Sequence, residues 1–227
     1  MKENSLTGTN ADTFIDLLVN IITGNVIGGA VDVAKIGKSI IDIPNYRVWD
    51  NFCKFLQAGT MLDSEQTLND DLLRRLSEIL EEHGNKAENA RRILYIVADM
   101  ECDAAARYVG WLTQALVYKR LGFEQYFRCL KVIKNIIVED LELLTQKMER
   151  KDYNFTLNAE STIEFVNNGL LIQQRGKLVP TNLAYDLVNC GIRWGHSDLK
   201  KPEVLPGIDV IDTSSIAYLD VCEDIVV

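Results

Sequence analysis

The sequence predicts a mainly α protein, built as a helical bundle with a small α+β unit near its C-terminus. Apolar residues recur at helical spacing along most of the chain, which is the strongest single indication of amphipathic helices. Only 4 prolines and 14 glycines occur among 227 residues, so few positions interrupt those helices. One short stretch after residue 169 instead alternates two apolar runs around a polar turn, which is typical of a β-hairpin.

The same pattern suggests how the chain is divided. An apolar fraction of 47% and a charged fraction of 25% are ordinary globular values, which argues against wholesale disorder. We expect four consecutive parts: an N-terminal helical hairpin with an aromatic helix (1–60), a central helical bundle (61–151), an α+β unit (152–195), and an extended linker with a C-terminal tail (196–227).

The N-terminal part holds a segment that is unusually free of charge. No charged residue occurs from Leu17 to Val31, yet this run is shorter than the roughly 20 apolar residues that span a bilayer. Gly24, Gly28 and Gly29 would let two helices approach closely, either within a folded core or within a membrane. We expect a buried hairpin, and a membrane-acting role of residues 13–43 is the alternative.

An aromatic helix should follow this segment. Pro44 can occupy its first turn, and Ala58 with Gly59 should close it. Its apolar face would include Trp49 and Phe52.

The central bundle is predicted from three apolar stripes and one longer pattern. The stripes are Leu72, Leu73, Leu76, Ile79 and Leu80; Ala90, Ile93, Leu94 and Val97; and Tyr108, Trp111 or Leu112, Ala115 and Leu116. One long helix from Phe123 to about Lys151 would follow, with inward side chains at Phe127, Leu130, Ile133, Ile137, Leu141 and Leu144. Short connections between these segments imply antiparallel neighbours.

The α+β unit is the most readable stretch. It begins with a helix whose apolar face would hold Ala159, Ile163, Val166 and Leu170. A short hairpin around residues 170–179 should follow. Thr181 can then cap a last helix that ends at Gly191.

The order helix, strand, turn, strand, helix over residues 158–191 resembles the C-terminal half of a winged-helix domain. In DNA-binding members of that family, the helix before the wing enters the major groove with basic or amide side chains. The matching helix here carries no cation, and its polar residues are Glu160, Ser161, Thr162, Glu164, Asn167 and Asn168. We therefore expect Glu160, Glu164 and Asn167 to form a protein-contact surface. The rest of the chain is similar only to uncharacterised bacterial or phage-encoded helical proteins, a resemblance that implies no activity.

Charge makes nucleic acid an unfavourable partner. The formal net charge is -9 and the sequence pI is about 4.8, whereas phosphate backbones are usually met by a basic face. One basic group could still form an anion-contact face: Lys119, Arg120, Arg128, Lys131 and Lys134. If any region touches phosphate, we expect it to be this one.

Recognisable catalytic patterns are missing from the sequence. It has two histidines, His83 and His196, and no nucleophile elbow, phosphate-binding loop or zinc-type spacing, so we expect no catalytic, cofactor or metal residues. Asp99, Glu101 and Asp103 could hold a hard cation, but acids at a helix start more often complement the helix dipole. Five cysteines without a paired spacing suggest reduced, mostly buried thiols in a cytoplasmic protein.

These observations favour a non-enzymatic protein-binding or scaffold protein in the cytoplasm, with a protein partner of unknown identity. Three alternatives remain at this point. The first is a DNA-binding transcriptional regulator that uses the wing and the basic side of the long helix. The second is a membrane-acting effector of a defence or toxin system that uses residues 13–43. The third is an enzyme that uses the Asp99, Glu101 and Asp103 carboxylates.

Overall fold

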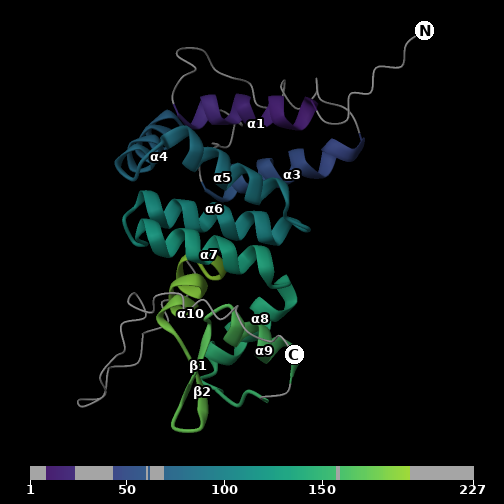
Figure 1. Ribbon diagram of the computed structural model, residues 1–227, viewed down its shortest axis with the longest axis vertical. Helices are drawn as coiled ribbons and strands as arrows, with labels where there is room; N and C mark the ends of the chain where they lie inside the picture. Colours follow the sequence, from purple (N-terminus) through teal and green to yellow (C-terminus); the bar gives the residue numbers. More distant parts are fainter. Residues whose placement is uncertain (1–8, 24–42, 60, 62–68, 157–158, 195–227) are drawn as a thin grey trace, which may run out of the picture.

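A computed structural model describes most of the chain, and it confirms a mainly helical fold with one two-stranded antiparallel sheet near the C-terminus (Figure 1). The described residues are 9–23, 43–59, 61, 69–156 and 159–194. The predicted second half of the N-terminal hairpin, with its glycine-rich stretch, and the predicted linker and tail therefore lie outside them.

Figure 1 shows the helices stacked along the long axis, with α1 at one end and the β-hairpin at the other. The helices are α1 (Thr9–Ile22), α3 (Ile43–Ala58), α4 (Asp70–Glu82), α5 (Lys86–Ala98), α6 (Asp103–Val117), α7 (Phe123–Asn135), α8 (Val138–Glu149), α9 (Glu160–Asn167) and α10 (Asn182–Leu187). The strands are β1 (Leu171–Gln174) and β2 (Lys177–Pro180), and a π-helical turn, η1 (Val188–Ile192), continues α10.

Helix α6 is the central element of the core. It packs against α3, α4, α7 and η1, and ten of its fifteen residues are buried. Gly110 is the point of closest approach to α3, because a Cβ atom there would lie 2.5 Å from the carbonyl oxygen of Phe55. The predicted aromatic face of α3 is confirmed at Phe52 and Phe55, which are fully buried.

Helix α1 belongs to the same core. Ile15, Leu18, Val19 and Ile22 are buried, and the helix packs against α5 and α4. In the uncharged N-terminal segment, Leu18, Val19 and residues 21–23 are therefore buried in the protein, whereas Asn20 is exposed. Among the described helices, none combines the length and the apolar character needed to cross a bilayer.

The predicted helix from Phe123 to Lys151 is wrong, because the chain breaks into α7 and α8. Ile136 and Ile137 take extended backbone conformations between the two helices, and Ile136 is buried. Ile137, which was expected to point inward, is 56% exposed. Helical spacing runs through the break by coincidence, whereas the carboxylates in the first turn of α8 favour a new helix start there.

The C-terminal unit has the predicted order of elements. Strands β1 and β2 pair from Leu171↔Pro180 to Gln174↔Lys177, leaving Arg175 and Gly176 as a two-residue turn. Both turn residues have positive φ, 49° and 78°, which is the geometry that matches the twist of a hairpin. The hairpin therefore forms at the arginine-glycine pair that the sequence offers.

Thr181 caps α10 as predicted, and its hydroxyl also connects α10 to the end of α9. Its hydroxyl accepts a hydrogen bond from the backbone N–H of Ala184 (3.3 Å) at the start of α10. The same hydroxyl donates to the carbonyl oxygen of Gly169 (2.7 Å), just after α9.

The unit is docked on the bundle through α10 and η1. Helix α10 packs against α7, and η1 packs against α6. A Cβ atom at Gly191 would lie 3.1 Å from the side chain of Leu112, so glycine permits this close approach. The predicted end of the last helix at Gly191 thus falls inside the π-helical turn that meets α6.

Candidate protein-binding surface

Among the described residues, helix α9 buries one side against the rest of the protein. Thr162 and Phe165 are its buried residues, and the ring of Phe165 meets that of Phe155 edge-on with centroids 6.4 Å apart. Ile163 is 49% exposed and Val166 is 42% exposed. The expectation that both would line the buried face is therefore wrong, because the larger Phe165 occupies the core and turns them outward.

The outward side of α9 combines apolar and acidic groups. We use the name α9 contact surface for five residues: Glu160, Ile163, Glu164, Val166 and Asn167. Glu160 and Asn167 are exposed and Glu164 is half-buried, so the three residues predicted for protein contact lie beside the two exposed aliphatic side chains. On the adjoining strand β1, Ile172 is 38% exposed. A protein interface commonly has an apolar centre and a polar rim, and this surface offers both kinds of side chain.

Carboxylates from α8 lie beside this surface. Burial raises the pKa of Asp140, and the nearby charges of Glu139 and Glu160 raise it further. Within the described part of the chain, no salt bridge joins any of these three carboxylates to a cation. The edge of α9 next to α8 is therefore negatively charged and only weakly compensated.

The other end of α9 is fixed against α7. The amide nitrogen of Asn135 donates a hydrogen bond to the side-chain oxygen of Asn168 (3.2 Å). Asn168 also donates to the carbonyl oxygen of Glu164 (3.0 Å), which closes the last turn of the helix. Both hydrogen bonds hold α9 in place without covering Ile163 or Val166.

The predicted anion-contact residues do not share one environment. Arg128 and Lys131 are exposed along α7, and Lys134 forms a salt bridge with Asp99 (2.8 Å). The guanidinium of Arg120 lies 4.6 Å from the ring centroid of Trp194. Lys119 follows α6 and lines a pocket, as described below.

The carboxylates of Asp99, Glu101 and Asp103, which were the alternative cation site, are not brought together in the structure. Asp99 pairs with Lys134, and Asp103 lies 3.9 Å from Lys54. Across the residues that the structure describes, no three acidic, histidine or cysteine side chains converge as metal ligands. Asp103 lies in the first turn of α6, where it complements the helix dipole.

Histidine and cysteine side chains take structural positions where they are described. The ring of His83 stacks on that of Phe123 with centroids 4.1 Å apart, while His196 lies outside the described residues. Burial raises the pKa of Cys53 to about 11 and that of Cys129 well above its usual value, so both thiols stay protonated near neutral pH. Of the four described cysteines, Cys129 and Cys190 are buried, Cys53 is half-buried and Cys102 is exposed.

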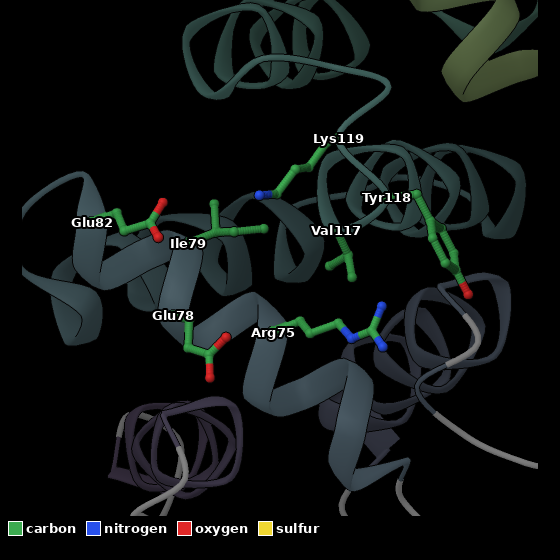
Figure 2. Close-up of a pocket in the computed structure, with 7 residues that line it drawn as sticks. All are labelled: Arg75, Glu78, Ile79, Glu82, Val117, Tyr118 and Lys119. Atoms are coloured by element: carbon green, nitrogen blue, oxygen red, sulfur yellow. The ribbon is translucent and has the colours of Figure 1, made fainter.

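A pocket of about 360 Å³ lies between α4 and the end of α6 (Figure 2). Its lining residues are Arg75, Glu78, Ile79, Glu82, Val117, Tyr118 and Lys119. Figure 2 shows the Lys119 amine pointing toward α4 and the Arg75 guanidinium lying near Val117.

The charges of this pocket largely balance within the protein itself. Arg75 pairs with Asp71 (2.8 Å) and Glu78 pairs with Arg74 (2.8 Å), so α4 satisfies part of the lining with its own ion pairs. Small-molecule sites are usually lined mainly by apolar side chains, whereas only Ile79 and Val117 are aliphatic here. The α9 contact surface is therefore the better candidate for function.

Comparison with known proteins gives no further guide to the site. No protein-family model, curated protein or solved structure matches the chain.

Proposed function

We propose that the chain is a cytoplasmic, non-enzymatic binding protein that contacts another protein through the α9 contact surface. The observation that carries this proposal is the exposure of Ile163 and Val166 on a helix whose opposite side is anchored by Phe165. Slightly less than half of each aliphatic side chain is in water, so full burial by a partner would gain on the order of 1 kcal/mol per side chain. A fixed backbone adds to this gain, because little ordering is needed on binding.

The charges support a protein partner over duplex DNA. A helix that enters a major groove approaches phosphates closely, and Glu160 with Glu164 would be repelled by them. The hairpin offers only Arg175 and Lys177 as cations near the same unit. The DNA-binding alternative therefore has a weaker basis at the helix on which the winged-helix resemblance depends.

A paired substitution tests the proposal. The full-length Ile163→Ser, Val166→Ser variant should still fold and lose at most about 1 kcal/mol of stability per substitution, because nearly half of each side chain is exposed. Affinity capture with quantitative mass spectrometry should show specific partners lost from this variant. The Tyr118→Ser variant is a matched control, because Tyr118 is an equally exposed apolar residue on a different surface (49%).

Two results would contradict the proposal. The first is an identical set of captured proteins for the wild type and the paired variant. The second is duplex-DNA binding that weakens with salt and is lost when Arg175 and Lys177 are changed to Ala, which would favour the regulator instead.

A further inference from the structure

We infer that the α9 contact surface takes a partner segment that presents aliphatic or aromatic side chains flanked by lysine or arginine. This inference rests on the proposed function and adds the chemical class of the partner. Its basis is the close placement of two exposed aliphatic side chains, Ile163 and Val166, and the carboxylates of Glu160 and Asp140.

The apolar half of this recognition follows from helix geometry. Ile163 and Val166 are three positions apart, so their side chains lie next to each other on α9. Glu160 is three positions before Ile163 and occupies the same side of the helix. A partner that covers the aliphatic pair must therefore pass beside the Glu160 carboxylate.

The acidic half extends beyond α9 itself. Asp140 lies near enough to Glu160 for the two charges to interact, and Glu139 adds a third carboxylate. Two cations on elements of this region have partners of their own: Lys147 donates to the carbonyl oxygen of Asn154 (2.8 Å), and Arg193 pairs with Glu149 (2.9 Å).

Bringing a cationic side chain to this edge would relieve repulsion between carboxylates. It would also give these carboxylates an oppositely charged partner, because none of the salt bridges among the described residues involves Glu139, Asp140 or Glu160. Complementary charge of this kind mainly sets specificity and the rate of association.

The same charges disfavour a second copy of the chain as the occupant. In a two-fold dimer each α9 contact surface would face its own equivalent. That arrangement would bring the Glu160 and Asp140 carboxylates of both copies to one interface, where like charges cost free energy. A different, basic partner avoids this cost.

Selection from a phage-displayed random peptide library tests the partner chemistry. Full-length wild-type protein would be the target, and peptides that the Ile163→Ser, Val166→Ser variant retains would be discarded. We expect the remaining peptides to be enriched in lysine or arginine next to aliphatic or aromatic residues.

Fluorescence anisotropy with the most enriched peptide then measures the electrostatic part. The Glu160→Gln, Asp140→Asn variant should bind this peptide about tenfold more weakly, and high salt should weaken wild-type binding. The Glu124→Gln variant on α7 is the matched control, since it removes an exposed carboxylate elsewhere and should leave the affinity unchanged.

The outcomes separate the two proposals. Two results would overturn the basic partner but not protein binding. One is a set of peptides that need Ile163 and Val166 but lack cationic residues, and the other is a peptide affinity that the Glu160→Gln, Asp140→Asn variant does not change. If the selection yields no peptide whose binding depends on Ile163 and Val166, the proposal of protein binding at this surface is itself overturned. A wild-type dimer that the aliphatic substitutions dissociate, seen by light scattering, would replace the basic partner with a second copy.

Discussion

Helices α6 and α9 both have apolar residues at helical spacing, but the protein covers them to different extents. Helix α6 is covered by α3, α4, α7 and η1, whereas α9 buries only Thr162 and Phe165 among its eight residues. Apolar spacing predicted both helices, but it did not predict which side of α9 the rest of the chain would cover. The comparison shows that a helix can be firmly placed by one side and keep the other side for recognition.

Substitutions on the two sides of α9 should give the largest difference in the free energy of unfolding. Phe165→Ala removes a fully buried ring and should lower the free energy of unfolding by about 4 kcal/mol. Ile163→Ala, two positions away on the exposed side, should change it by less than about 0.5 kcal/mol. Urea denaturation followed by circular dichroism measures both, and equal losses would show that the two sides of α9 do not differ.

Glycine sites on α6 and α7 test the buried side of the comparison. Gly110→Ala should destabilise the protein by about 3 kcal/mol, because the new methyl group meets the Phe55 carbonyl oxygen and the backbone of α3 must move. Gly122→Ala is the control, because a Cβ atom at Gly122 has no neighbour within 4 Å. It should cost at most about 1 kcal/mol through weaker capping of α7. Similar costs at both glycines would contradict the close approach of α3 and α6.

Substitutions at the C-terminal ends of α6 and α9 should change stability by smaller amounts and in opposite directions. Both end in a Schellman motif with a left-handed residue, Lys119 after α6 (φ 57°) and Gly169 after α9 (φ 72°). Lys119→Gly should therefore raise the free energy of unfolding by about 1 kcal/mol, and Gly169→Ala should lower it by a similar amount. Thermal denaturation measures both changes. A stability loss in Lys119→Gly would mean that contacts of the lysine side chain outweigh the backbone strain.

Much of the fold could be predicted because local chemistry and tertiary structure agree. Asn85 caps α5 by accepting hydrogen bonds from two backbone N–H groups, and Gly84 just before it has positive φ, so that helix begins where its sequence indicates. The hairpin forms at Arg175 and Gly176 for a similar reason, since glycine tolerates the turn geometry. The break after Asn135 could not be read from spacing, because Ile133, Ile137 and Leu141 keep one helical period across it.

The candidate site could be predicted only in part. The sequence itself shows that α9 is acidic, through Glu160 and Glu164. The exposure of Ile163, however, depends on where Phe165 packs. The proximity of Asp140 to Glu160 joins residues twenty positions apart in different helices, and sequence spacing cannot show it. The exposed aliphatic pair and the nearby Asp140 carboxylate therefore needed the tertiary structure, whereas the carboxylates of Glu160 and Glu164 could be predicted from the sequence.

The hydrogen bonds of Thr181 have a mechanical consequence. One hydroxyl ties the end of α9 to the start of α10, and η1, which continues α10, rests on α6 beside Gly191. A pulling force on α9 from a bound partner would therefore be shared between two routes: this hydroxyl and the hairpin, which lead to α6, and the Asn135–Asn168 hydrogen bond, which leads to α7. A force applied to the C-terminal unit would therefore reach the helical bundle through these contacts.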